Sequence, residues 1–437
     1  MKKHCTAILV FLLVFSGTAW PEPFRESDEP TISLEQCIGL ALENHPSILS
    51  AESDARSSSS RIDQQSAGFK PSVNITARHI ETSGNTTTSS GISLNQLISD
   101  GGRTSASVSA ARRNHDAACM NLERARQNVV YDVTAAYYAV LQAQRNVKVA
   151  EETLGLYEEQ LRKARSAYDV GVVARSDVTA AIVDLGNARL GLVSASADLR
   201  RAFAVLENSM GTPELPSGYR LVEAASPEKI TIDLDTAVDE AIKNRPDFAS
   251  NRFQVESAEA TLRLQEKSMS PELSAYAGYD WSHNGSGNDD DWQVGLSLSI
   301  PVYDGGLSRA KTEEARANLA KNLSGLDSSR MNILLEVRTA LLDLEEAGEF
   351  IDVSRLLVAQ ARENLDLATG RYHVGVGNSL EVSQAAENYS QAQKNHNEAI
   401  YQYHLAVAGL EASLGRDLLP WAGKALLSAE ETSKEVF

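Results

Sequence analysis

Two long stretches of the chain place apolar or aromatic residues at every seventh position. The first series is Val133, Val140, Val147, Leu154, Leu161 and Tyr168. The second returns at an offset of 204 residues, as Val337, Leu344, Ile351, Val358, Leu365 and Tyr372. A seven-residue period kept this long predicts left-handed coiled coils. We expect helical rods over residues 103–168 and 307–372, each about 100 Å long at a rise of about 1.5 Å per residue.

A pattern with a period of two precedes each rod and predicts one β-hairpin, over residues 71–100 and 271–304. In the second copy the alternating residues are Leu273, Ala275, Ala277, Tyr279 and Trp281, then Trp292, Val294, Leu296, Leu298 and Ile300. The first copy alternates more weakly. Strands of about ten residues cross a bilayer when tilted. Polar loops are expected over 81–90 and 282–291. Tyr279, Trp281 and Trp292 lie toward the second loop, where an aromatic membrane belt is expected.

The chain is duplicated internally. Leu34 to Pro46 matches Leu234 to Pro246, and an Asp-Gly-Gly junction ends each hairpin. We therefore expect repeat 1 over 32–211, a proline-containing linker over 212–231, repeat 2 over 232–415 and a tail over 416–437. Return helices are predicted at 176–210 and 379–414. The fold class is mostly α with a membrane β part.

The two rods end in the same turn. Tyr168 to Val178 corresponds to Tyr372 to Val382, with Gly171 and Gly375 as the helix breakers. Ser176 and Ser379 are predicted to cap the helices that follow. A turn present twice, at the far end of two rods of equal length, indicates a functional tip.

The N-terminus has a basic head, an apolar core and small residues before Ala19, which is typical of a cleaved signal peptide over 1–19. An extended segment over 20–31 follows. No later stretch reaches about 18 apolar residues, so no transmembrane helix is predicted. The formal net charge of −18 argues against nucleic acid as a partner. The isolated cysteines Cys37 and Cys119 do not indicate a disulfide framework.

Four membrane strands per chain are too few to close a barrel, for which about eight is the small end of the known range. Unpaired strand edges are not tolerated in lipid. Several chains must therefore share one barrel.

With its duplicated Asn-x-Pro helices, strand-Asp-Gly-Gly junctions and Tyr-x-Val-Gly-Val tips, the chain resembles the TolC-type outer-membrane efflux proteins over 32–415. The resemblance implies a homotrimer with a twelve-stranded barrel in outer-membrane lipid and a twelve-helix tube in the periplasm. It also implies a periplasmic adaptor and an inner-membrane pump, of the RND or ABC type, as partners in efflux or type I secretion.

The resemblance also implies gate residues. Asp177 is expected to pair with Tyr372 and hold the tube shut. Gly377 stands where the family has an arginine, and Arg175 on the first tip is the expected substitute. Glu381 and Gln384 align with paired aspartates that face the pore, which leaves a ring of three carboxylates in a trimer and favours cations. By itself Glu381 is equally well explained as a solvated acid at a helix start.

Adaptor docking is expected at residues of both tips, which are Gly171, Val172, Ala174, Ser176, Gly375, Val376 and Ser379. We find no pattern for a catalytic, cofactor or metal site. His115 and Cys119 have a helical metal spacing but lack a third ligand, and Asn288 to Asp291 is best explained as a hydrophilic loop. The alternatives to a channel are a periplasmic coiled-coil structural or adaptor protein, and an enzyme on a helical scaffold.

Overall fold

The structure is a computed structural model that describes residues 31–212, 220–222, 232–283 and 287–416. The predicted signal peptide 1–19 lies outside the described residues. So do nearly all of the segment 20–31, most of the linker 212–231 and the tail beyond Arg416.

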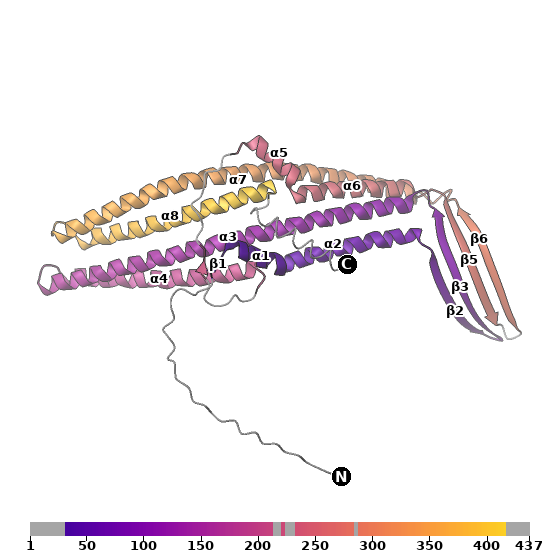
Figure 1. Cartoon of the computed structure of the whole chain (residues 1–437), viewed down its shortest axis with the longest axis horizontal. Coiled ribbons are helices and arrows are strands. Elements are labelled where there is room, and N and C mark those ends of the chain that lie inside the picture. Colours follow the sequence, from indigo (N-terminus) through magenta and orange to yellow (C-terminus); the bar gives the residue numbers. More distant parts are fainter. Residues whose placement is uncertain (1–30, 213–219, 223–231, 284–286, 417–437) are drawn as a thin grey trace, which may run out of the picture.

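Two rods of 67 residues each, α3 (Arg103–Asp169) and α7 (Leu307–His373), run the length of the helical part. Shorter helices lie end to end beside them. These are α2 (Pro46–Ser66) with α4 (Arg175–Ser209), and α6 (Pro246–Glu266) with α8 (Ser379–Leu414). Across the molecule the order is α7, then α6 and α8, then α3, then α2 and α4 (Figure 1). The helices of one chain therefore form an elongated strip.

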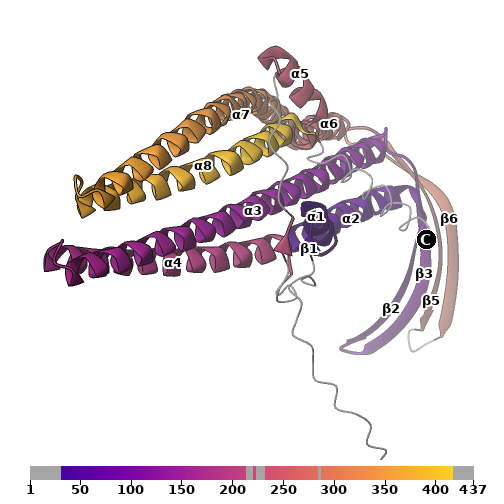
Figure 2. The same ribbon diagram turned by 60° about the vertical axis from the view of Figure 1, so that its left-hand side comes forward.

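The seven-residue stripes form the core of this wall. Val133 and Val140 in α3, and Val337 in α7, are fully buried, and Leu344 and Leu365 are nearly so. Two short helices, α1 (Leu34–Asn44) and α5 (Leu234–Asn244), pack on α3 and α7 at mid-height. Figure 2 shows that α5 stands out from the strip.

A four-stranded antiparallel sheet continues the strip at one end. Its strands are β2 (Ser72–Thr82), β3 (Asn85–Ser99), β5 (Glu272–His283) and β6 (Asn288–Ser299), in that order. A second, two-stranded sheet pairs β1 (Thr31–Ile32) with β4 (Arg220–Leu221), and the 3-10 helix η1 (Ala67–Phe69) precedes β2. The predicted loops at 81–90 and 282–291 are wrong in extent. Strands occupy most of both stretches, since the Thr- and Ser-rich run after Asn85 suits a pleated sheet.

The register gives the large sheet one apolar and one polar face. Tyr279 lies opposite Ile92 on one side and Trp292 on the other, and two residues further along its strand lies Trp281. Because side chains alternate along a strand, these residues share one face with Val73, Ile75, Leu94, Val294, Leu296 and Leu298. The opposite face carries mainly Ser, Thr, Gly, Asn and Asp. A half-apolar sheet of this kind suits a boundary between lipid and water.

Each junction between sheet and rod is built by an aspartate and two glycines. Asp100 accepts hydrogen bonds from the amides of Gly102 (3.0 Å) and Thr104 (2.6 Å), and Asp304 does the same for Gly306 and Ser308. Gly102 has φ 86° and Gly306 has φ 89°, where a side chain is strained. The motif therefore turns the strand into the rod.

By length and composition, one described helix, α4, is apolar enough to cross a membrane, although the sequence pattern predicts none. It lies along α3 in the helical strip, far from the sheet (Figure 1). Only 17% of its most apolar window is buried within one chain, so this helix has an apolar face to cover.

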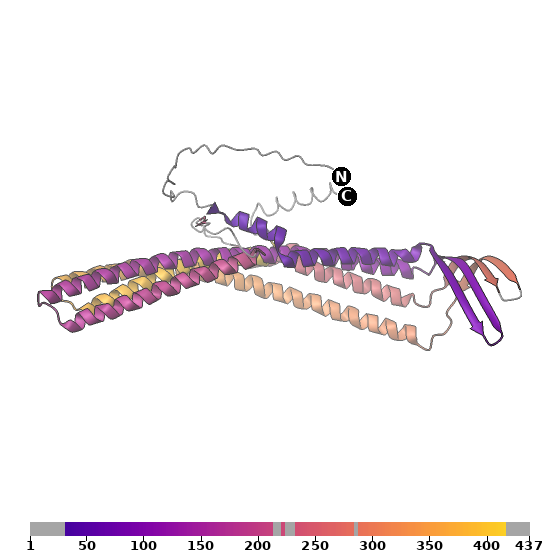
Figure 3. The ribbon, with the colours of Figure 1, turned by 90° about the horizontal axis from the view of Figure 1, so that it is seen from below.

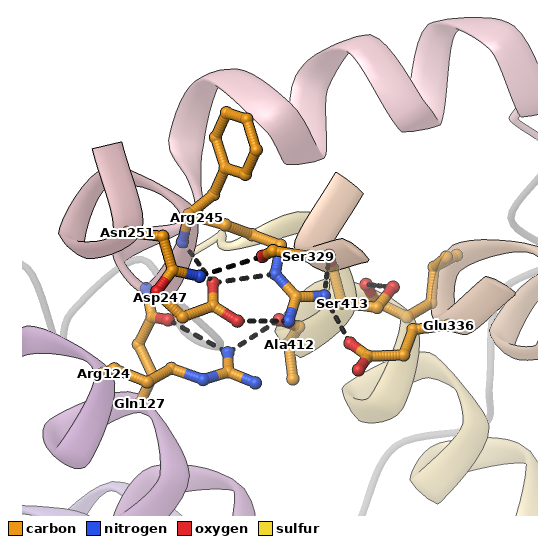
Figure 4. Close-up of polar contacts among 11 residues, drawn as sticks. Arg124, Gln127, Arg245, Asp247, Asn251, Ser329, Glu336, Ala412 and Ser413 are labelled. Atoms are coloured by element: carbon orange, nitrogen blue, oxygen red, sulfur yellow. Dashed lines mark hydrogen bonds and ion pairs between the residues drawn. The ribbon is translucent and has the colours of Figure 1, made fainter. Parts of the chain in front are cut away.

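A buried arginine fixes the mid-height region of repeat 2 (Figure 4). Arg245, 2% exposed, stands between α5 and α6 and donates to both carboxylate oxygens of Asp247, at 3.0 and 2.6 Å. It also donates to Glu336 of α7 and to the carbonyl of Ser413 in α8. Burial would raise the pKa of Asp247, but the hydrogen bonds and charge of Arg245 hold it below its ordinary value.

We expect Asp247→Asn to lower the stability of the helical part by about 1.5–3 kcal/mol, since it weakens the charged hydrogen bonds to the buried Arg245, which keeps Glu336 as a second partner. The carboxylate contributes stability above its unfolded-state pKa of about 3.9, and this contribution is lost as the pH falls through the lower folded-state pKa. When the pH is lowered below 4, the melting temperature of the variant should therefore drop by less than that of the parent. Thermal melts followed by circular dichroism measure both effects. The exposed Asp239→Asn is the control, and equal losses in the two variants would contradict the assignment.

Candidate functional site

The two tips lie side by side at the end of the strip opposite the sheet (Figure 3). In the first, Val172 donates its amide to the carbonyl of Ala167 (2.9 Å) around Gly171, whose φ is 76°. In the second, Val376 donates to Arg371 (3.0 Å) around Gly375, whose φ is 77°. The left-handed glycine lets each rod end within one turn.

The predicted N-caps Ser176 and Ser379 are wrong. The cap of α4 is Ala174, whose extended backbone supplies no side-chain hydrogen bond. The cap of α8 is Asn378, whose side-chain oxygen accepts the amide of Glu381 at 2.8 Å. The two serines are therefore already helical residues. An asparagine directly before the helix was the available signal.

The tips present apolar side chains to solvent. Val172 and Val376, next to the turn glycines, are 74% and 72% exposed. Val170 and Val374, on the other side of each glycine, are also exposed, as is Leu380 at the start of α8. Exposed apolar residues gathered at one end of a molecule indicate a surface that binds another protein.

Tyr372 and Asp177 are neighbours but do not form a hydrogen bond in the structure. Among the described residues, the Tyr372 hydroxyl is buried without a hydrogen-bond partner. Burial raises the pKa of this phenol, and the negative charge of Asp177 raises it further. Asp177 itself accepts a long hydrogen bond (3.5 Å) from the hydroxyl of Ser176. The tyrosine thus packs between the rods with its polar atom available.

Arg371 was missed from the sequence. Its guanidinium forms an ion pair with Glu381 (3.8 Å) and so joins α7 to α8 at the second tip. A side chain at Gly377 would place its Cβ 3.1 Å from the Cβ of Arg371. Glycine at 377 therefore leaves room for the arginine at 371. Arg371 and Glu381 line a hollow of about 620 Å³ between α7 and α8, together with Asn364, Leu367, Ala368, Asn378, Leu380, Gln384 and Ala385.

The other predicted gate residues, Gln384 and Arg175, have contacts other than the ion pair between Arg371 and Glu381. Gln384 donates to Asn388 one turn along α8 (3.4 Å), and both are exposed. Arg175 is the exposed first residue of α4, where its carbonyl accepts a hydrogen bond from Thr179.

About one turn above the tip, Ser383 of α8 connects three helices. Its hydroxyl donates to Asp184 of α4 (2.6 Å) and accepts from Gln160 of α3 (3.1 Å), while its carbonyl accepts from Tyr157 of α3 (3.3 Å). Burial, followed by the charge of Asp184, raises the pKa of Tyr157 to about 12. Hydrogen bonds, rather than apolar contacts alone, hold repeat 1 to repeat 2 at this level.

The other motifs have structural partners. The Cys119 thiol lies 3.7 Å from Nε2 of His115, whose Nδ1 is 2.9 Å from the hydroxyl of Ser58. Asn288 to Asp291 lies inside β6 and not in a loop, which corrects its assignment. Within the described ranges, no three His, Cys, Asp or Glu side chains gather in a metal-binding arrangement.

Known proteins match this chain over nearly its whole length. The sequence profile of the family described as "Outer membrane efflux protein" matches residues 37–212 and 237–416, one segment in each repeat. The outer membrane efflux protein BepC of Brucella suis is 26% identical over 92% of this chain and 90% of its own. The outer membrane protein TolC of Vibrio cholerae is 21% identical over 88% and 90%.

Solved structures agree on the fold. The CmeC outer membrane channel of Campylobacter jejuni superposes with a TM-score of 0.79 at 16% identity, covering 90% of this chain and 89% of that one. The family profile thus matches both repeats, and the solved structure has the same fold. The chain belongs to the outer membrane efflux protein family, whose members are channels and not enzymes, and it is an outer-membrane exit channel.

Proposed function

We propose that three copies of the chain form one continuous duct, with a twelve-stranded barrel in the outer membrane and a twelve-helix tube below it. The observation that carries this proposal is the pair of free edges on one chain. Strands β2 and β6 stand at the two sides of the sheet without a partner among the described residues. Edges of 11 and 12 residues cannot stay unpaired in lipid, and copies of the same chain supply the matching edges.

The apolar sheet face contacts lipid in this arrangement, and the polar face lines the passage. Tyr279, Trp281 and Trp292 then stand near the outer rim, where amphipathic aromatic rings settle at a membrane surface. Trp292 is 73% exposed in the single chain, which fits a side chain that lipid covers.

The tips serve two tasks in the proposed duct. The exposed residues around Gly171 and Gly375 dock a periplasmic adaptor, which links the duct to an inner-membrane pump of the RND or ABC type. The docking set comprises Gly171, Val172, Ala174, Ser176, Gly375, Val376 and Ser379. Tyr372, Asp177, Glu381, Gln384 and Arg175 surround the entrance and control its width. Arg371 joins this set, because its ion pair with Glu381 ties α7 to α8 where the family's arginine is absent.

Purification tests the proposed function. The mature protein should leave outer membranes only with detergent, run as a trimer, and conduct ions in planar bilayers. A soluble, monomeric protein would instead support the alternative of a periplasmic coiled-coil protein without a pore.

The combined substitution Tyr372→Phe and Asp177→Ala should raise single-channel conductance, because it removes the hydroxyl and the charge that lie near each other at the proposed gate. Tyr168→Phe, at the equivalent position of the first tip, is the matched control. Conductance equal to that of the parent would remove this pair from the gate.

Glu381→Gln should reduce the preference for cations over anions, because the proposed trimer would lose its ring of three carboxylates. Gln384→Glu adds three carboxylates one turn away and should increase the same preference. Reversal potentials across a KCl gradient measure both variants against the parent. Shifts in the same direction, or no shift in either variant, would contradict a pore-facing ring.

A further inference from the structure

The seam between the two repeats is polar at every seventh residue. Three residues of α3, one heptad apart, bond to three residues of α8, also one heptad apart. Asn146 meets Asn397 (3.4 Å), Thr153 meets Ser390 (3.0 Å) and Gln160 meets Ser383 (3.1 Å). Gln160, Ser390 and Asn397 are almost fully buried. Buried polar pairs in a coiled coil fix its register, because a shifted register leaves them without partners.

The duplication makes this seam a template for another one. The counterpart of each α3 residue lies 204 positions later in the sequence, in α7. In the same way, the counterpart of each α8 residue lies 204 positions earlier, in α4. The counterpart of the seam between α3 and α8 is therefore a seam between α7 and α4. Within one chain these two helices lie at opposite sides of the strip (Figure 1). Such a seam can form only between α7 of one copy and α4 of another.

The exposed apolar residues of α7 lie where this reasoning requires them. Phe350 and Leu357 are the counterparts of Asn146 and Thr153, and both are exposed. Leu335, Leu342 and Met331 are exposed too. Their counterparts lie against α8 or its end: Tyr131 lies beside Gly409, Tyr138 stacks on His404, and Gln127 donates to the carbonyl of the cap residue Gly415. The helix face that α3 uses within the chain is thus exposed and apolar in α7, and Leu335 and Phe350 on it also border a hollow of about 820 Å³ shared with α8 and α3.

The face of α4 is complementary. Val193, the counterpart of Asn397, is 65% exposed. Val205, which would face Leu335 in this seam, is also exposed. The counterpart of Ser390 is Gly186, where an added Cβ would meet open space. A glycine opposite Leu357 leaves a gap for a large side chain. The level nearest the tip keeps a polar pair, Asn364 with Thr179.

We infer that α7 packs on α4 of a neighbouring copy in one register, with Phe350 on Val193, Leu357 on Gly186 and Asn364 on Thr179. This inference rests on the proposed function, since it assumes the closed tube. The two kinds of seam then differ in chemistry, polar within a chain and mainly apolar between chains. If α7 took the place of α3 against α8, Ser390 would be buried against Leu357 and Asn397 against Phe350. Neither polar side chain would then have its partner from α3. The difference therefore selects both partner and register.

Cysteine pairs test the register in the full-length protein, purified from outer membranes with Cys119 replaced by serine. Leu357→Cys with Gly186→Cys, and separately Phe350→Cys with Val193→Cys, should form disulfides between chains upon oxidation, seen as dimers and trimers in non-reducing electrophoresis. Thr153→Cys with Ser390→Cys should close a disulfide within one chain. Leu357→Cys with Val193→Cys is one heptad out of register and should stay uncrosslinked, since disulfides need Cβ atoms about 4 Å apart.

The outcomes separate the register from the function. Interchain bonds in the out-of-register pair, or their absence in both in-register pairs of a trimeric, conducting protein, would overturn the inferred seam and leave the channel intact. A protein that is monomeric and soluble would overturn the proposed function itself.

Discussion

Every helix in the wall of a tube needs a packing neighbour on each of its two sides, and this constraint governs the whole chain. Within one copy, α3 packs on α4 and on α8, while α7 and α4 form the two margins of the strip (Figure 1). The sheet repeats the situation, with β2 and β6 as its two margins. One cause explains three observations, because the margins of a single chain have no neighbour within that chain. These observations are the apolar composition of α4, the exposed leucines of α7 and the free strand edges. In the proposed duct a single chain is one section of the wall, and further copies cover its margins.

The two repeats solve the same packing problem with different chemistry at mid-height. The helix-ending glycines Gly211 and Gly415 each approach the backbone of a cap residue so closely that an added Cβ would lie 2.9 Å from its Cα. That cap residue is His45 in repeat 1 and Arg245 in repeat 2. His45 bonds to the hydroxyl of Ser47 at 2.7 Å, whereas Arg245 forms ion pairs. The backbone geometry is shared, and only repeat 2 adds buried charge.

The rods and the junctions were predictable from the sequence, whereas the helix caps and the side-chain pairs between helices were not. The heptads give the rods, and the Asp-Gly-Gly motif gives the junctions, because each depends on neighbouring residues. The caps of α4 and α8 were assigned to serines because side-chain type alone does not reveal where extended backbone ends. The pair between Arg371 and Glu381 was missed for a different reason. Its partners sit on two helices, and the room for the arginine comes from a third residue, Gly377.

The polar ladder between α3 and α8 shows why a duplicated chain needs more than apolar heptads. Apolar contacts are non-directional, so rods with the same seven-residue stripe fit one another in several registers and with several partners. Asn146 and Gln160 interrupt that equivalence, because each amide requires a hydrogen-bonding partner at its own level, and Thr153 adds a polar contact to Ser390. Their counterparts in α7 are a phenylalanine, a leucine and an asparagine. Two rods that share a length, a stripe and a tip are thus made distinct by a few buried positions. Those positions decide which neighbour each rod accepts.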